Sequence, residues 1–188
     1  MYSDGTPCVT NTYDRLGRLI TVACNGMTDT LSYNLAGELL GESFAGGPLN
    51  GLTVTDNYDQ FLRRTNLTAL AAQASSVLNS TVYGCAAASR LQTVNDGHLN
   101  TATYTYLANS PLVSQIAFAT NGMTRMTTGK TYDYLNRLTQ ISSTPSGTGI
   151  LPVTYNYNYN PANQRTKNTL ADGSYWLYDK GSVNGIVM

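Results

Sequence analysis

The sequence predicts an all-β protein whose tandem β-hairpins form an antiparallel sheet. Three observations support this prediction: a short phrase recurs along the chain, aromatic and polar residues alternate before many of its copies, and Thr and Tyr are abundant, with 26 and 14 of 188 residues. A phrase that recurs every 20 to 30 residues or so indicates a repeat architecture in which each copy stacks on its neighbours. Thr and Tyr favour the pleated, half-buried surface of a strand.

Each copy of the phrase begins with an anchor residue. The clearest copy runs from Tyr13 to Leu19 and reads YDRLGRL, and the copy from Tyr132 to Leu138 is nearly as clear. Successive anchors are 19 to 27 residues apart, and they are Tyr13, Tyr33, Tyr58, Cys85, Tyr106, Tyr132, Tyr159 and Tyr178. Nothing marks an internal domain boundary, so we expect residues 1–188 to form a single array of about eight repeats.

Positions after the anchor follow a pattern. Asp or Asn comes next in six copies, at Asp14, Asn34, Asp59, Asp133, Asn160 and Asp179. The fourth place holds Gly, Ser or Asn at Gly17, Gly37, Ser89, Ser110, Asn136, Asn163 and Ser182, and Leu62 alone departs. The fifth place holds arginine at Arg18, Arg63, Arg90 and Arg137, and the sixth holds leucine at Leu19, Leu39, Leu91, Leu112 and Leu138. A second aromatic precedes the anchor by two places at Tyr83, Tyr104, Tyr157 and Trp176.

Each copy is interpreted as a β-hairpin. The alternation before the anchor is typical of a strand with one packed face. Asp or Asn begins a turn because its side chain bonds its own backbone. Gly, Ser or Asn suits the positive φ at the end of a short loop, and the return strand follows. We expect the tyrosines to stack in a ladder across strands. The arginines are expected over neighbouring tyrosine faces or paired with the turn carboxylates.

One stretch conflicts with this pattern. Residues 67–78 are rich in Ala and favour a helix by propensity alone. The stretch stands where the other copies place a return strand and the next entry strand. We therefore predict strand here, because tertiary context overrides propensity.

Composition excludes several classes of protein. Eleven basic and eleven acidic residues cancel, and charged residues are 12 % of the chain, which argues against a nucleic-acid or anionic-membrane surface. No apolar run is long enough for a membrane span, and the first residues do not resemble a secretory signal. The cysteines have no metal or redox spacing, so we expect reduced thiols at Cys8, Cys24 and Cys85.

A search for catalytic residues gives little. His98 is the only histidine and stands in a turn-like segment without a nucleophile or cysteine beside it, so we expect a surface-loop residue. The Asp residues of the phrase recur with the array, as scaffold residues do, and the only glutamates are Glu38 and Glu42. No phosphate loop, nucleophile elbow or zinc pattern is present. We expect no enzymatic activity, no cofactor and no metal.

The phrase YDxxGRL at this spacing resembles the YD-repeat family, also called RHS repeats. The resemblance covers about residues 10–179; the copy at Tyr13 fits the family pattern fully, and the copy at Tyr132 has Asn136 in place of Gly. In that family the repeats form a long sheet that spirals into a hollow shell, found in bacterial polymorphic toxins, insecticidal toxin complexes and teneurins. The shell encloses a carboxy-terminal toxin domain or builds an extracellular scaffold.

The resemblance has limits. A full shell uses many more repeats than eight, and bacterial members carry a self-cleaving Asp-Pro-x-Gly segment, whereas this chain has no Asp-Pro dipeptide. The resemblance therefore implies a curved antiparallel sheet, an open segment of a YD-repeat spiral shell. We expect a fragment without a separate toxin or core domain, whose partner is the rest of a larger chain or its toxin. The resemblance implies a secreted or cell-surface location.

Three functional hypotheses follow. The first is a non-enzymatic structural module, part of a toxin-enclosing shell. The second is a binding module whose tyrosine ladder docks a glycan or an extended protein strand. The third is an unrecognised hydrolase. In addition, open sheet edges with few charges to guard them favour self-association.

Overall fold

The structure, a computed structural model, describes residues 6–71, 76–178 and 186–187. Within these ranges every regular element is a β-strand, and neighbouring strands pair antiparallel. The predicted all-β class and the hairpin repeat are therefore confirmed. The described part of the chain has no helix that could span a membrane.

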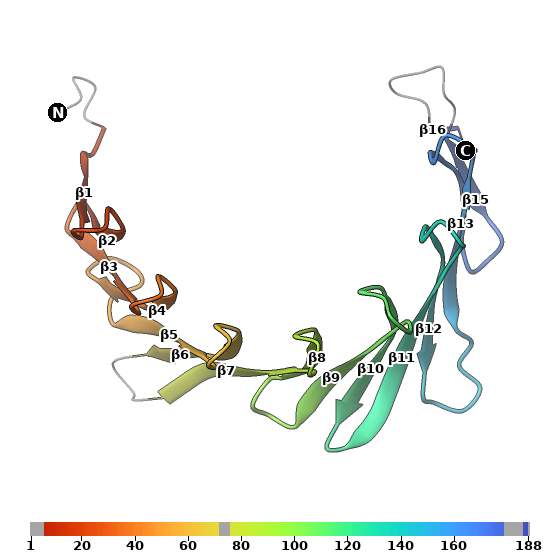
Figure 1. Ribbon diagram of the computed structural model, residues 1–188, viewed down its shortest axis with the longest axis horizontal. Coiled ribbons are helices and arrows are strands. Elements are labelled where there is room, and N and C mark those ends of the chain that lie inside the picture. The colour runs from red at the N-terminus through yellow and green to blue at the C-terminus, as the bar shows by residue number, and fades with distance from the viewer. Residues whose placement is uncertain (1–5, 72–75, 179–185, 188) are drawn as a thin grey trace. The chain divides into compact units, whose positions relative to one another are not determined.

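Contacts divide the chain into two compact units, Met1–Gly84 and Cys85–Met188, which are described separately. In the first unit the strands lie side by side in chain order (Figure 1). They are β1 (Val9–Tyr13), β2 (Leu19–Cys24), β3 (Met27–Tyr33), β4 (Leu39–Ala45), β5 (Leu52–Tyr58), β6 (Arg64–Ala71) and β7 (Ser76–Cys85), whose last residue begins the second unit. The described residues of the Ala-rich stretch belong to the strands β6 and β7, as predicted. Residues 72–75 within the stretch lie outside the described residues.

The second unit follows the same plan. Its strands are β8 (Leu91–Asn95), β9 (Asn100–Tyr106), β10 (Val113–Thr120), β11 (Met123–Tyr132), β12 (Leu138–Pro145), β13 (Val153–Tyr159), β14 (Arg165–Thr169), β15 (Tyr175–Tyr178) and β16 (Ile186–Val187). Because each strand pairs with the next in an up-and-down order, the turns that follow the anchors all lie along one edge of a unit.

The anchor turns share one backbone geometry. In the first, the Asp14 N–H donates to the Arg18 carbonyl at 2.9 Å, and the Gly17 N–H donates to the Asp14 carbonyl at 3.1 Å. Gly17 has φ 79°, which closes a three-residue hairpin loop with a bulge. Leu62, the exception in the sequence pattern, has φ 60° at the same place. The position therefore constrains the backbone more strongly than it constrains the residue type.

One copy differs from its predicted alignment. After Tyr106 the turn is one residue longer, since the Leu107 N–H donates to the Leu112 carbonyl. Positive φ falls on Asn109 rather than Ser110, and Val113 pairs with Tyr106 in place of Leu112. Counting places from the anchor assumed a constant turn length. In this longer turn the positive φ lies one place earlier and the residue that pairs with the anchor lies one place later.

Two further turns went unrecognised in the sequence. Asn25-Gly26 joins β2 to β3 and Asn121-Gly122 joins β10 to β11, each with positive φ at both residues. Asn-Gly between alternating strands is the signature of a tight type I′ hairpin, and this dipeptide alone would have located both turns.

The two faces of each unit differ in chemistry. The anchor face, which carries the anchor side chains, bears apolar and aromatic residues such as Val22, Leu31, Phe44, Leu67, Ile116, Phe118, Ile141 and Trp176. The opposite, threonine face bears Thr12, Thr21, Thr30, Thr55, Thr68, Thr103, Thr127, Thr144 and Thr154.

The sheet of each unit is a single layer. Among the described residues no apolar side chain is fully buried, and the polar Asp56 is only 5 % exposed. The sequence analysis expected one packed face, but the apolar residues of the anchor face are only half-buried between their neighbours within the sheet. Stability must therefore come largely from contacts along the sheet, and those contacts centre on the repeated residues.

Candidate functional site: the arginine and tyrosine interlock

The repeated residues link each hairpin to the next. Five anchor tyrosines donate their hydroxyl hydrogen to a backbone carbonyl in the preceding copy, the one belonging to the first residue of its return strand. The pairs are Tyr33 to Leu19, Tyr58 to Leu39, Tyr106 to Leu91, Tyr132 to Val113 and Tyr159 to Leu138. The hydroxyl thus ties two hairpins together, which explains why Tyr rather than Phe recurs at this place.

The arginine of the fifth place extends in the other direction along the array. Arg18 lies over the ring of Tyr33, with 4.9 Å between its guanidinium carbon and the ring centroid, and donates to the Asn34 carbonyl at 2.9 Å. Arg137 repeats both contacts with Tyr159 and Asn160. Such a guanidinium gains cation–π attraction and satisfies an acceptor of the next turn. We call these links between successive copies, the hydroxyl bond of the tyrosine and the contacts of the arginine, the interlock.

The same arginines also close their own turns. Arg18 Nε donates to Asp14 Oδ2 at 2.6 Å, and Arg137 Nε donates to Asp133 Oδ2 at 2.7 Å. Both predicted partners, tyrosine faces and turn carboxylates, are therefore present at once. At three anchors, Tyr33, Tyr106 and Tyr159, the group that lies over the ring is an arginine of the preceding copy.

Copies that depart from the pattern keep part of the interlock. In the copy that begins at Cys85, Ala86 stands in place of the acid, yet Arg90 still lies over Tyr106 and donates to the Ser110 carbonyl at 2.6 Å. Arg63 lies over the ring of Phe61 in its own turn and donates to Asp59 Oδ2 at 2.7 Å. The anchor after Arg63 in the sequence is Cys85, which has no ring.

The remaining repeated residues are placed as follows. Asn34 and Asn160 accept backbone N–H groups in their turns as the aspartates do. Gly37 has φ 98°. Tyr104 and Tyr157 lie two places before their anchors on the anchor face, and Arg165 covers the Tyr157 ring. Tyr178 is 37 % exposed, and Asp179 and Ser182 lie outside the described residues.

Hydrogen bonds within the turns lower the pKa of the turn carboxyls. For Asp14 the largest cause is the backbone N–H of Arg18, followed by its guanidinium; for Asp59 it is the side chain of Arg63. Several donors on one carboxylate favour its ionised form. Two carboxyls outside the anchor turns have a lowered pKa for the same reason. The largest cause is the Asn100 side chain for Asp96, in the turn-like segment of His98, and the Ser174 side chain for Asp172.

We predict that these turns make the fold sensitive to acid. A carboxyl whose pKa is lowered by folding contributes stability above its unfolded value of 3.8, and this contribution is lost as pH falls through the folded value. Urea unfolding should be measured at several pH values from about 7 to about 2. The urea concentration at the midpoint of unfolding should fall below about pH 4. The combined variant Asp14→Asn, Asp59→Asn, Asp133→Asn should flatten that fall. An equally steep fall in the variant would contradict the assignment.

A second acidic group lies on the anchor face of the first unit. Burial raises the pKa of Glu42, and a hydrogen bond with Asp29 and the charge of Asp29 raise it further. Leu31 pairs with Glu42 and Phe44 pairs with Asp29, so the two carboxyls are diagonal neighbours on adjacent strands. Asp29 Oδ1 is buried without a hydrogen-bond partner.

We expect Glu42→Gln to stabilise the protein at neutral pH. A carboxyl whose pKa is raised by folding contributes stability below its unfolded value of 4.5, and that contribution is lost as pH rises through the folded value. Gln keeps the hydrogen-bonding shape without the charge, so its urea midpoint should exceed that of the parent chain at pH 7 and match it at pH 4. A lower midpoint at pH 7 would refute the carboxyl pairing.

The rest of the described chain offers little for catalysis. His98 is exposed in the loop between β8 and β9, where its backbone N–H donates to Asp96 Oδ1 at 2.8 Å, as its turn-like sequence predicted. No group of three or more His, Cys, Asp or Glu among the described residues could hold a metal ion. Cys8, Cys24 and Cys85 are free thiols.

Three open hollows lie on the anchor face, at the edge opposite the anchor turns. One of about 250 Å³ lies among Val22, Met27, Asp29 and Phe44. Another of about 300 Å³ lies among Val94, Ala102, Phe118 and Arg125, and a third of about 290 Å³ lies beside Tyr155 and Asp172. The first two occupy corresponding places, since Val22–Asp29–Phe44 and Val94–Ala102–Phe118 are equivalent cross-strand rows. Their recurrence marks them as features of the repeat.

No family model and no curated protein matches the chain. Solved structures do resemble it. TcdB2-TccC3-TEV matches over 96 % of this chain and 13 % of its own length, with a TM-score of 0.51 and 15 % identity. The Photorhabdus luminescens Tc holotoxin pore matches over 92 % of this chain and 12 % of its own, with a TM-score of 0.51 and 15 % identity.

A third structure, TcdB2-TccC3 without its hypervariable C-terminal region, matches over 94 % of this chain with a TM-score of 0.50 and 15 % identity. The chain spans 12 to 13 % of the length of these three structures. At this level of identity the likeness concerns the fold, and it relates the chain to a small part of far longer ones.

Proposed function

We propose that the chain is a YD-repeat module with a structural, non-enzymatic role, a section of the sheet that encloses a toxin in RHS-type proteins. The observation that carries this proposal is the interlock. The recurring phrase uses its Asp, its Arg and its Tyr to close one hairpin and bind the next, so its polar groups face other parts of the array. In a catalytic site such groups converge on a substrate instead.

The likeness to Tc toxin structures supports the same proposal. The first of those structures is named for TcdB2 and TccC3, the second for a Tc holotoxin pore with TccC3, and both are much longer than this chain. The partner of this module is accordingly the rest of a larger RHS-type chain, or the toxin domain that such a chain encloses, outside the cell or at its surface. Recognition of glycans or other proteins is not needed for this role.

The test begins with the DNA on either side of the coding sequence. We expect further YD repeats in the same or a neighbouring reading frame. The joined chain should then be expressed with a protease-sensitive reporter at its carboxy-terminal end. The reporter should resist digestion in the joined chain and be cleaved when fused to the 188-residue chain alone. Flanking DNA without such repeats, or a reporter cleaved equally fast in both proteins, would overturn the proposal.

A second candidate, glycan binding, is favoured by one feature of β13 to β15. Tyr155 is 38 % exposed beside the hollow that contains Asp172, and exposed aromatic rings with nearby polar groups suit sugar stacking. Glycan-array signal that disappears in Tyr155→Ala would support this function. The same loss in Tyr134→Ala, whose ring is 91 % exposed in an anchor turn, would mark the signal as non-specific.

A further inference from the structure

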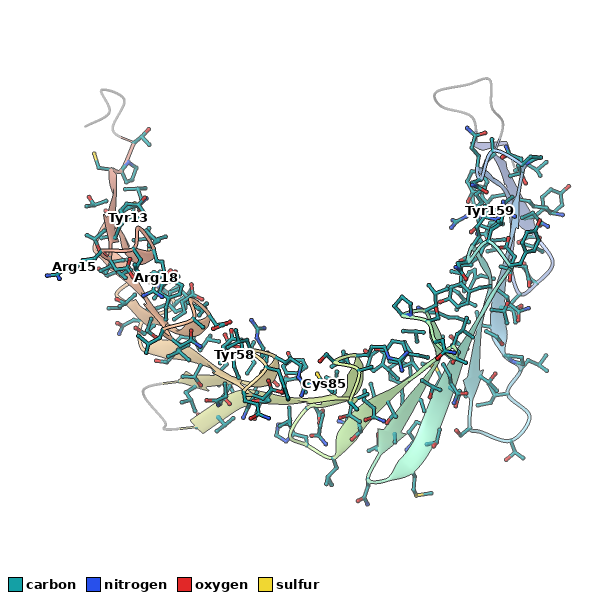
Figure 2. All side chains as sticks on the ribbon, viewed as in Figure 1. Tyr13, Arg15, Arg18, Tyr58, Cys85 and Tyr159 are labelled. Carbon is teal, nitrogen blue, oxygen red and sulfur yellow. The ribbon has the colours of Figure 1, made fainter. Side chains whose placement is uncertain are left out.

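The edge strand β1 is the most open part of the first unit. All five of its residues are exposed, and among the described residues it pairs with β2 alone. Its anchor Tyr13 is 57 % exposed, whereas the five tyrosines of the interlock are half-buried with their hydroxyls donated to a preceding copy. Figure 2 shows Tyr13 on this strand, near one end of the unit.

No residue of β1 protects this edge. Natural edge strands are guarded by charges, prolines or bulges that turn the strand away from partners. The sequence from Val9 to Tyr13, VTNTY, has no charged residue and no proline. Its single register shift lies at the end next to the anchor turn. The other residues present a regular extended backbone.

The sequence of β1 is complementary to itself. If two copies pair antiparallel about Asn11, then Val9 of one copy faces Tyr13 of the other, and Thr10 faces Thr12. Val9, Asn11 and Tyr13 share the anchor face, because Asn11 pairs with Val22 and Val9 with Cys24, so the aromatic and β-branched pairs meet on that face. The Thr10 and Thr12 pairs meet on the threonine face. Aromatic–aliphatic and Thr–Thr pairs are among the favourable cross-strand combinations.

We propose that the outer edge of β1 binds the same edge of a second copy of this chain, around a two-fold axis at Asn11. The interface is isologous, each copy offering the same strand, and it closes at two copies. Both anchor faces then lie on the same side of the joined sheet. A five-residue strand buries less area than a stable dimer requires, so the association is weak and depends on concentration. This proposal concerns the 188-residue chain by itself and does not rest on the proposed shell function, in which a neighbouring hairpin of a larger chain would occupy the same edge.

Substitutions at the axis test this register directly. In Asn11→Lys the two lysines face each other across the axis, and like charges directly opposite are destabilising. Sedimentation velocity over a concentration series should show a monomer–dimer equilibrium for the parent chain and a dissociation constant raised about tenfold or more for Asn11→Lys. Asn11→Glu should behave in the same way. An equal mixture of the two variants should restore dimers, because opposite charges then meet.

The control is Asn57→Lys. Asn57 is also exposed on a strand, but β5 is paired on both sides, with β4 and β6. This variant should dimerise as the parent does, and circular dichroism should show the same β-sheet signal for all variants. A parent chain that stays monomeric throughout, growth beyond dimers, or a mixture of Asn11→Lys and Asn11→Glu that remains monomeric would each overturn the proposal.

Discussion

Replacing Tyr132 with Ala should lower the free energy of unfolding by about 3 kcal/mol. The substitution removes a half-buried ring from the anchor face, together with the hydroxyl that donates to the Val113 carbonyl at 2.9 Å. Burial also raises the pKa of the Tyr132 hydroxyl, in keeping with its place between two hairpins. Because the described residues include no fully buried apolar core, the loss cannot be absorbed by repacking in a second layer.

Two variants separate the ring from the hydroxyl. Tyr132→Phe should cost about 1 kcal/mol, since only the hydrogen bond is lost. Tyr134→Ala is the matched control, because this tyrosine is two residues away but 91 % exposed, and its loss should change stability little. Urea unfolding followed by circular dichroism measures all three. If Tyr134→Ala were as damaging as Tyr132→Ala, the role given to the interlock would be wrong.

Replacing Arg137 with Ala should lower the free energy of unfolding by about 2 kcal/mol. One guanidinium bonds Asp133 in its own turn and the Asn160 carbonyl and Asn163 Oδ1 in the next, while it covers the Tyr159 ring. Lys cannot reproduce this planar set of donors, so Arg137→Lys should recover little of the loss.

The control for Arg137 is Arg15→Ala. Arg15 also belongs to an anchor turn, but its side chain is exposed and points away from the sheet (Figure 2). The same urea measurement should give a change close to zero for this variant. Equal effects at both positions would show that net charge, rather than the geometry of the interlock, determines the stability.

The sequence was sufficient for the all-β class and the hairpins because their signals are local. Asp14 with Gly17 indicates a turn through bonds within four residues, and tertiary context then extended this reading over the Ala-rich residues 67–78. Backbone conformation was harder to predict where residue type varied, since Leu62 adopts the positive φ that Gly adopts elsewhere. Turn length was also hard to predict: one added residue after Tyr106 places Val113, rather than Leu112, opposite the anchor.

The interlock could be predicted only in part. The sequence suggested that arginines would meet tyrosines or carboxylates, but it could not show that one guanidinium does both. That fact depends on the distance between successive hairpins, which is set by strand pairing rather than by residues near Arg18. The pairing of Glu42 with Asp29 was missed for the same reason, since the two residues are brought together by the register of β3 and β4.

The direction of the interlock has a consequence for how such a gene changes. Each arginine contacts the copy that follows it. A mutation that removes an anchor tyrosine therefore leaves the arginine of the preceding copy without its ring, while the turn after the lost anchor stays closed. Deletions and duplications do least harm when their breakpoints fall in the loops at the edge opposite the anchors, where anchor spacing already ranges from 19 to 27 residues. We therefore expect the duplications and deletions that persist in such a gene to keep an arginine and the next anchor tyrosine together.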